Sequence, residues 1–305
     1  MSTRTAIVFP GQGSQRPGMF DTVPEHDSID RLLDAAEALS DMNLRRIAAD
    51  GSAEELTDTR AAQPLLYLVD WVWGVTLLES GLEPVALAGH SLGELAALAV
   101  AEVFSVEAGL ELVVERSKLM SATVKTTPGS MAAVLGMSST AIAEVMNTIE
   151  GVWIANDNAP GQVVISGTKD GVASATKALT DSGARRIVPL PVAGPFHSPL
   201  MEPAQSAFAD LLAQAEFRTP AIPVIQNTEP EPSSDPDLIK QRLAAQITAP
   251  VRWTETMAAL AADGPITLIE SGPGAVLKGL ARKMDDITVL TVESTGLEAI
   301  VEEVV

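Results

Sequence analysis

The sequence predicts an α/β fold with a largely parallel central sheet and a smaller ferredoxin-like subdomain inserted into it. Two observations lead to this fold class. Short apolar runs are followed by glycine-rich turns and then by helical stretches, an order typical of strands that alternate with helices in a parallel sheet. In the middle of the chain the order changes to β-α-β-β-α-β, which is the ferredoxin-like arrangement.

The larger domain is expected from the two ends of the chain. Its strands are predicted at residues 5–9, 85–88 and 266–269, and a glycine-rich turn follows each of them. Its helices are predicted at residues 64–78, where Pro64 suits the first turn, at 94–100 and at 276–284. Residues 228–236 are rich in Pro, Glu and Ser and are expected to form a surface loop.

The inserted subdomain is expected from the middle of the chain. Its strands are predicted at residues 131–135, 152–155, 163–166 and 186–192, with a loop at 156–161. Its helices are predicted at residues 139–149, which begin with Ser, and at 169–180, which stop before Gly183. The expected boundaries are therefore 127–194 for the subdomain, and 1–126 and 195–305 for the two parts of the larger domain.

The composition excludes several classes of function. Twenty Lys and Arg residues against forty Asp and Glu residues give a net charge of −20, which repels nucleic acids. The chain has no cysteine and three histidines, so we expect no disulfide and no metal site. The sequence shows neither a leader nor a run of about 20 uncharged apolar residues. We therefore expect a cytoplasmic protein that does not enter a membrane.

The strongest chemical motif is Gly-His-Ser-Leu-Gly at residues 89–93, which has the form G-x-S-x-G. It falls where a predicted strand ends and a predicted helix begins, as in a nucleophile elbow. There the Ser91 hydroxyl is exposed at a helix N-terminus, and the N–H of Leu92 can stabilise an oxyanion. The alternative is a glycine-rich turn in which Ser91 only caps the helix.

A serine nucleophile requires a base, and histidine is the natural candidate. His90 directly precedes Ser91 and is expected to point away from it, whereas His26 lies in a polar segment and is expected to be exposed. His197 remains, at the point where the chain returns from the subdomain. It is the predicted general base, although it could also be an ordinary residue at a helix N-terminus.

With these residues in view, the chain resembles the malonyl-CoA:acyl carrier protein transacylases of fatty acid and polyketide synthesis. The resemblance covers nearly the full length. The motifs that carry it are FPGQGSQ at 9–15, Gln63-Pro64, GHSLGE at 89–94, Arg116, NAPGQVVISG at 158–167, PFHS at 195–198, PVRW at 250–253 and ESGPG at 270–274. The resemblance implies a hydrolase-like α/β domain with an inserted ferredoxin-like subdomain.

The resemblance also implies roles for individual residues. Ser91 would carry the acyl group, His197 would be its base, and a backbone carbonyl near Gln246 would orient the imidazole in place of a carboxylate. The N–H groups of Gln12 and Leu92 would bind the oxyanion. The substrate-binding residues would be Arg116, Gln246, His90, Phe196 and Asn158. The substrate would be a malonyl coenzyme A thioester, and the acceptor the phosphopantetheine of an acyl carrier protein, with no cofactor.

Two of these residues would set the acyl selectivity. Arg116 would pair with the free carboxylate of malonyl, because a guanidinium binds a carboxylate through two parallel hydrogen bonds. Taken without the family, Arg116 could equally be a surface residue paired with Glu111 or Glu115. Phe196 resembles the residue of malonyl-selective members, and its ring would crowd a methylmalonyl branch.

An acidic carrier needs a basic docking surface on this acidic chain. The expected surface combines Lys278, Arg282 and Lys283 of the helix at 276–284 with Arg185 and Arg186 of the subdomain. These five side chains could also be ordinary solvated charges. Three other functions remain open: the transacylase subunit of a malonate decarboxylase, a serine hydrolase or thioesterase, and a non-catalytic protein that binds carriers.

Overall fold

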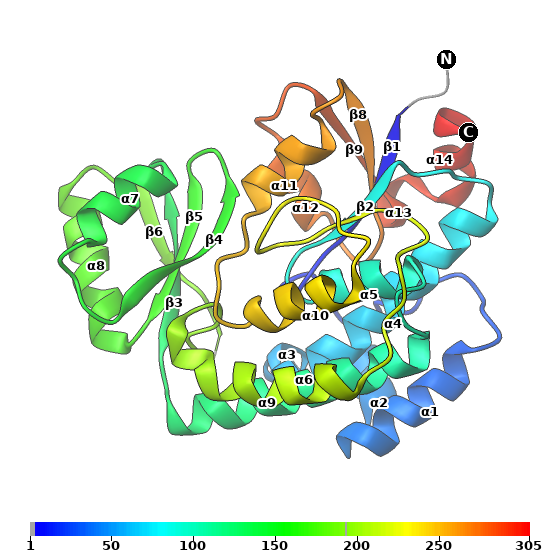
Figure 1. The fold of residues 1–305 in the computed structure, drawn as a ribbon, viewed down its shortest axis with the longest axis horizontal. Helices are drawn as coiled ribbons and strands as arrows, with labels where there is room; N and C mark the ends of the chain where they lie inside the picture. The colour runs from blue at the N-terminus through cyan, green and yellow to red at the C-terminus, as the bar shows by residue number, and fades with distance from the viewer. Residues whose placement is uncertain (1–3, 193) are drawn as a thin grey trace.

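Two separate sheets organise the computed structural model, which describes residues 4–192 and 194–305 (Figure 1). The first sheet is parallel throughout and has the order β7-β2-β1-β8-β9. Its strands are β1 (Thr5–Phe9), β2 (Ala86–Gly89), β7 (Val224–Ile225), β8 (Ile266–Glu270) and β9 (Ile287–Thr291). The predicted parallel sheet is therefore confirmed, and sequence analysis missed its two outer strands, β7 and β9.

Helices cover both faces of this sheet, and the side chains of each strand point alternately toward one face and the other. In β1, Ile7 and Phe9 face the main core, which is completed by α4 (Thr59–Glu79), α5 (Gly93–Val100) and α6 (Val106–Thr126). Ala6 and Val8 face the other way, toward α11 (Trp253–Leu260) and α12 (Val276–Ala281). The sheet is thus the middle layer of three.

The larger part of the molecule contains one long apolar helix and several shorter ones. Helix α4 is long and apolar enough to cross a membrane, but 83% of its most apolar stretch is buried in the protein, as expected of a core helix. The remaining helices there are α1 (Ile29–Ser40), α2 (Leu44–Asp50), α3 (Ala53–Thr57), the 3₁₀ helix Pro199–Met201, α9 (Glu202–Gln214), α10 (Pro236–Ala245), α13 (Val292–Thr295) and α14 (Leu297–Val304).

The second sheet is antiparallel and has the order β4-β5-β3-β6. It consists of β3 (Ser130–Leu135), β4 (Val152–Ala159), β5 (Gln162–Gly167) and β6 (Arg186–Pro189). Helices α7 (Ser139–Met146) and α8 (Lys169–Asp181) cover one face, where they pack on Ala132, Val134 and Ile165. This arrangement confirms the ferredoxin-like subdomain, which forms the green lobe of Figure 1. The exact boundaries at 127 and 194 remain a prediction.

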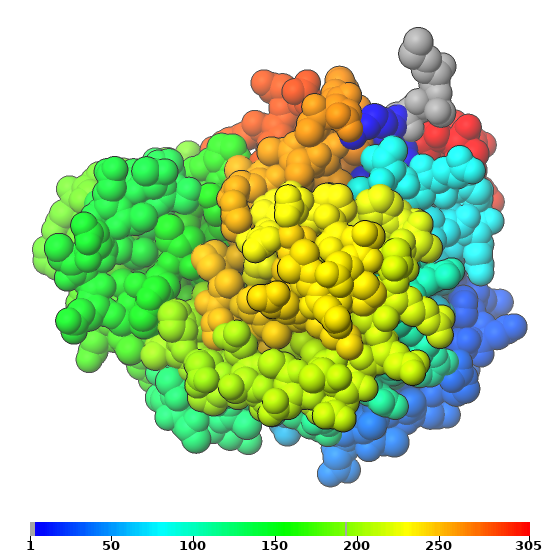
Figure 2. Space-filling view, viewed as in Figure 1, coloured from blue at the N-terminus to red at the C-terminus, as the bar shows by residue number. Residues whose placement is uncertain are grey.

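The subdomain is attached to the larger part along β4. Asp157 N–H donates to Val251 O at 2.9 Å, and Val251 N–H donates to Ala155 O at 2.9 Å. In the space-filling view, the green subdomain accordingly touches the orange segment that contains α11 (Figure 2). The other face of the second sheet, which includes Met131 and Val164, joins the main core.

Several predicted boundaries are wrong. Helix α4 begins at Thr59 rather than at 64, so Pro64 lies inside the helix and not in its first turn, and α7 ends at Met146 rather than at 149. Residues 156–159, expected in a loop, continue β4 through two bulges, because they pair with β5 and with Val251. Strand β6 ends at Pro189 rather than at 192, and α12 ends at Ala281 rather than at 284. Residues 228–235 form the expected loop, while Pro236 already begins α10.

Candidate active site

Ser91 lies on a tight turn between β2 and α5, and its φ angle is +52°. Left-handed backbone is unfavourable for a residue with a side chain, and it is typical of a nucleophile elbow. The turn is possible because glycines flank it. A Cβ atom at Gly89 would collide with the backbone of Gly93, and one at Gly93 would collide with the carbonyl oxygen of Phe9.

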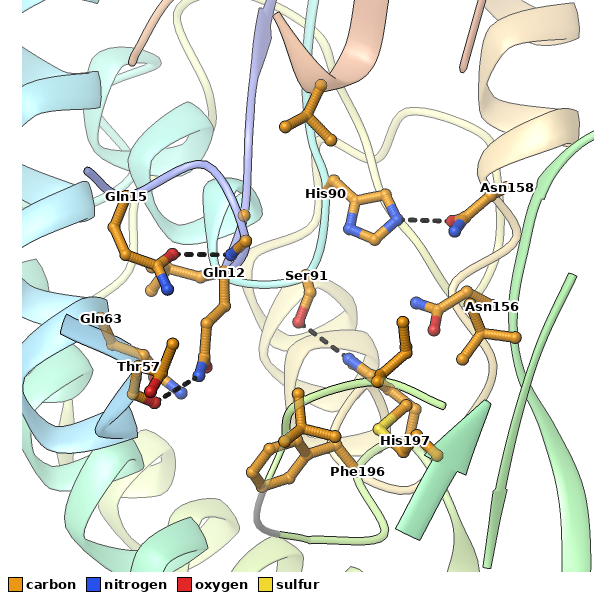
Figure 3. Close-up of a pocket in the computed structure, with 18 of the residues that line it drawn as sticks. Gln12, Gln15, Thr57, Gln63, His90, Ser91, Asn156, Asn158, Phe196 and His197 are labelled. Atoms are coloured by element: carbon orange, nitrogen blue, oxygen red, sulfur yellow. Dashed lines mark hydrogen bonds between the residues drawn. The ribbon is translucent and has the colours of Figure 1, made fainter. Parts of the chain in front are cut away.

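His197 meets Ser91 across the cleft, as Figure 3 shows. Its Nε2 lies 2.8 Å from Ser91 Oγ, and its Nδ1 lies 2.8 Å from the main-chain oxygen of Gln246. Since a carbonyl oxygen only accepts, Nδ1 carries the proton and Nε2 is free to take one from the serine. The geometry is that of a Ser-His dyad whose imidazole is oriented by a backbone carbonyl.

The environment keeps the imidazole of His197 neutral. Burial, reinforced by the nearby charge of Arg116, lowers the pKa of His197 to about 3. The ring is therefore unprotonated at neutral pH and available as a base. His197 also has a left-handed backbone, with φ of +54°, so both members of the dyad sit in strained conformations.

Arg116 projects from α6 into the same site and is only 1% exposed. It donates to Gln63 Oε1 at 2.7 Å, to Gln246 Oε1 at 3.0 Å and to Ser91 Oγ at 3.3 Å. Burial lowers its pKa to about 10, so the guanidinium remains charged at neutral pH. The alternative of a surface residue paired with Glu111 or Glu115 is wrong, because the Arg116 side chain is buried and Glu115 binds Lys118.

A cleft between the two sheets brings most of the predicted residues together. Its volume is about 280 Å³, and its walls include Gln12, Leu92, Arg116, Phe196 and His197. The loop that carries Gln12 packs closely on the elbow, since a Cβ atom at Gly11 would collide with His90 O. Gln12 and Leu92 therefore both line the cleft, and the role of their N–H groups as oxyanion donors remains a prediction.

His90 and Asn158 occupy the opposite wall. The His90 ring turns away from the nucleophile, as expected, and its Nε2 lies 2.8 Å from Asn158 Oδ1 (Figure 3). Burial lowers the pKa of His90, so this ring too is neutral. These two side chains are in place to contact a substrate but not to act as the base.

Comparison with known proteins places this site in a family. Residues 6–293 match the family described as "Acyl transferase domain". The malonyl CoA-acyl carrier protein transacylase of Bacillus subtilis (strain 168) is 40% identical over 291 residues, which cover 93% of this chain and 91% of that protein. The chain belongs to the malonyl CoA-acyl carrier protein transacylase family. The resemblance carried by the motifs is thereby confirmed.

Solved members of the family share the whole fold. The malonyl CoA-acyl carrier protein transacylase of Coxiella burnetii superimposes with a TM-score of 0.92 at 32% identity, covering 100% of this chain and 98% of that one. A malonyl-transacylase in complex with its type II PKS acyl-carrier protein gives 0.92 at 34% identity, covering 99% and 100%. The hydrolase-like core with a small subdomain is thus common to this chain and to its relatives.

Sequence analysis named Gln246 as a site residue but missed the roles of Gln63, Glu94 and Asn227, whose side chains lie behind the dyad. Gln63 and Gln246 both bind the Arg116 guanidinium through their side chains, and Glu94 and Asn227 lie beneath the elbow. Glu94 and Gln63 stood inside quoted motifs, so a signal existed for those two. Asn227 lies in no motif that sequence analysis used.

Two further expectations, on His26 and on the docking helix, need correction. His26 is half-buried rather than exposed, with its ring against Trp71 at a centroid distance of 5.0 Å. Of the proposed docking residues, only Lys278 lies within α12, because the helix ends before Arg282 and Lys283. Across residues 4–192 and 194–305, no group of three or more His, Asp or Glu side chains is arranged to hold a metal ion.

The five predicted docking residues all lie on the surface of the molecule. Lys278, Arg282 and Lys283 are exposed, as are Arg185 and Arg186. Lys283 Nζ donates to Pro160 O at 3.2 Å, in the turn between β4 and β5. Gly161 in this turn binds Gly136, whose missing side chain leaves room for Arg185. Lys283, which follows α12, and Arg185 of the subdomain therefore approach the same turn, and we call this edge the basic rim; a role of the rim in docking stays a prediction.

Proposed function

We propose that this chain transfers a malonyl group from coenzyme A to the phosphopantetheine thiol of an acyl carrier protein through a malonyl ester of Ser91. The observation that carries the proposal is the position of Arg116, whose Nη2 lies 3.3 Å from Ser91 Oγ in a buried site. An acyl group on Ser91 therefore ends beside a buried cation. A free carboxylate on that acyl group is the natural partner of this cation.

The dyad supplies the chemistry in two half-reactions. His197 Nε2 takes the Ser91 proton while Oγ attacks the thioester carbonyl, and the oxyanion is bound by the amides of Gln12 and Leu92. The coenzyme A sulfur leaves with the proton from His197. The phosphopantetheine thiol then attacks the ester carbonyl with the same histidine as base, and Ser91 regains its proton.

Arg116 makes the reaction selective for carboxylated acyl groups. The malonyl carboxylate would bind the guanidinium directly in place of water, whereas acetyl would leave the side of the guanidinium that faces the cleft without a direct partner. Phe196 is 7% exposed and lines the same cleft, so its ring is in place to crowd an α-methyl branch. The proposed order of preference is malonyl over methylmalonyl and over acetyl.

The basic rim is the proposed docking surface for the acidic carrier. Charge reversal at Lys283 and Arg185 should raise the KM for the carrier and leave the KM for malonyl-CoA unchanged. Lys177→Glu is the matched control, because Lys177 is an exposed lysine on α8 that pairs with Asp181. An unchanged KM for the carrier in the rim variants would refute this docking surface.

The decisive experiment is intact-mass measurement after incubation with malonyl-CoA, alone and then with a carrier. We expect one malonyl group on the wild-type chain, none on Ser91→Ala, and transfer to the carrier on its addition. Rapid consumption of malonyl-CoA without a carrier would instead identify a hydrolase. Parallel runs with a fatty acid carrier and a type II polyketide carrier test the pathway. We propose a cytoplasmic location, with which the cysteine-free sequence is compatible.

A further inference from the structure

Glu94 is a buried carboxylate that has no role in the mechanism above. It lies in the first turn of α5, three residues after Ser91, and is 1% exposed. Three donors converge on it: Gln226 Nε2 at 3.1 Å from Oε1, and the N–H of Asn227 at 2.8 Å and Gln246 Nε2 at 3.0 Å, both from Oε2. Burial of a carboxylate is costly, and full hydrogen bonding offsets that cost.

Glu94 fixes the orientation of the Gln246 side chain. The Gln246 amide nitrogen donates to Glu94 Oε2 and to Ser91 O, so its oxygen must face the other way, where it accepts from Arg116 at 3.0 Å. The main-chain oxygen of the same residue binds His197. One residue held by Glu94 thus orients both the base and the arginine.

Glu94 also fixes the elbow from below through Asn227. The Asn227 side chain accepts the N–H of Ser91 at 2.7 Å and donates to Gly89 O at 2.6 Å. These two bonds hold both ends of the strained turn. Because the Asn227 backbone is itself bound to Glu94, the carboxylate is connected to the nucleophile by a second route.

The charge of Glu94 balances that of Arg116 across the Gln246 amide. Burial raises the pKa of Glu94 and lowers that of Arg116, and the opposite charges of the two groups partly counteract both shifts. The carboxylate does not line the cleft, so it leaves the front of the guanidinium free for a ligand.

We propose that Glu94 is a positioning residue that holds Gln246 and Asn227, and through them the Ser91 elbow, the His197 imidazole and the Arg116 guanidinium, in reactive register. The selectivity part of this proposal rests on the proposed function; the part that concerns Ser91 and His197 does not.

The test is Glu94→Leu, which keeps a side chain of similar bulk and removes both acceptor oxygens. Two readouts are measured on protein that circular dichroism shows to be folded. The first is the rate at which a neutral fluorophosphonate labels Ser91, and the second is the ratio of the malonyl to the acetyl loading rate. Tyr67→Phe is the control, because it removes a buried hydrogen bond, to Val106 O at 3.0 Å, away from the site.

We expect both readouts to fall at least about tenfold in Glu94→Leu. A displacement of a catalytic group by 1 Å can lower the reaction rate on the order of 100-fold. Tyr67→Phe should lower the thermal stability of the protein and leave both readouts unchanged. Values for both readouts that match the control would overturn the proposal and leave Glu94 a purely structural residue.

If Glu94→Leu does not fold, Glu94→Asp replaces it. The shorter carboxylate keeps the charge but cannot reach Asn227 and Gln246 together, so both readouts should fall in the same direction. Wild-type values there would overturn the proposal. Fluorophosphonate labelling without malonyl loading in the wild-type chain would refute the proposed function alone, because labelling still tests Glu94.

Discussion

Replacing Arg116 with Met should slow the loading of malonyl onto Ser91 but not the loading of acetyl. Methionine is similar in length to arginine and apolar, so it removes the cation while filling most of its space. The malonyl carboxylate would then enter a buried site without a charged partner. The acetyl group has no charge at that position, so its loading should be unchanged or faster.

The expected size follows from burial. Arg116 is 1% exposed, and in the part of the chain that the structure describes its Nε is buried without a hydrogen-bond partner. Removing one member of a buried ion pair costs about 3–5 kcal/mol. At about 1.4 kcal/mol for each factor of ten, malonyl loading should slow roughly 10²- to 10⁴-fold.

The assay is the rate of Ser91 acylation, followed by intact mass with malonyl-CoA and acetyl-CoA side by side. Arg31→Met is the control, because Arg31 is an exposed arginine that pairs with Glu107 and does not line the cleft. The control should keep both rates. An equal loss for the two acyl groups in Arg116→Met would show that the arginine serves the dyad rather than the acyl carboxylate.

Three further changes probe other parts of the site. Gly93→Ala should destabilise the fold by about 1–3 kcal/mol in denaturant unfolding, since its Cβ would collide with Phe9 O; a change below about 0.5 kcal/mol would contradict the packing argument. Because the pKa of His197 is lowered to about 3, the imidazole stays neutral as pH falls, and fluorophosphonate labelling of Ser91 should be constant from pH 8 to 5; an inflection near 6.5 would disprove this. Phe196→Ala should raise methylmalonyl relative to malonyl loading about tenfold by intact mass, and an unchanged ratio would exclude the ring as the selector.

Sequence analysis predicted the elements that carry strong local signals. The apolar run at Thr5–Phe9 is a strand with those bounds, and the glycines at 89 and 93 correctly indicated a tight turn around Ser91. The assignment of His197 as the base came from elimination among three histidines. The structure places its Nε2 at hydrogen-bond distance from Ser91 Oγ, so this part of the site was predictable.

What escaped sequence analysis depends on contacts between distant segments. Residues 156–159 look like a loop because Asn and Asp disfavour strands, yet pairing with β5 and with Val251 makes them part of β4. The bond between Glu94 and Gln246 joins residues 152 positions apart. No local pattern reports such a bond, because each of its residues alone reads as an ordinary polar side chain.

His197 follows Ser91 by 106 residues, with the subdomain between them, and the carbonyl that orients the base comes 49 residues later still. During synthesis, domains fold as units from the N-terminus onward. A nascent chain therefore exposes its serine long before residues 197 and 246 can reach it. The complete dyad can therefore form only after residue 246 has been made, and we expect shorter nascent chains not to react with thioesters.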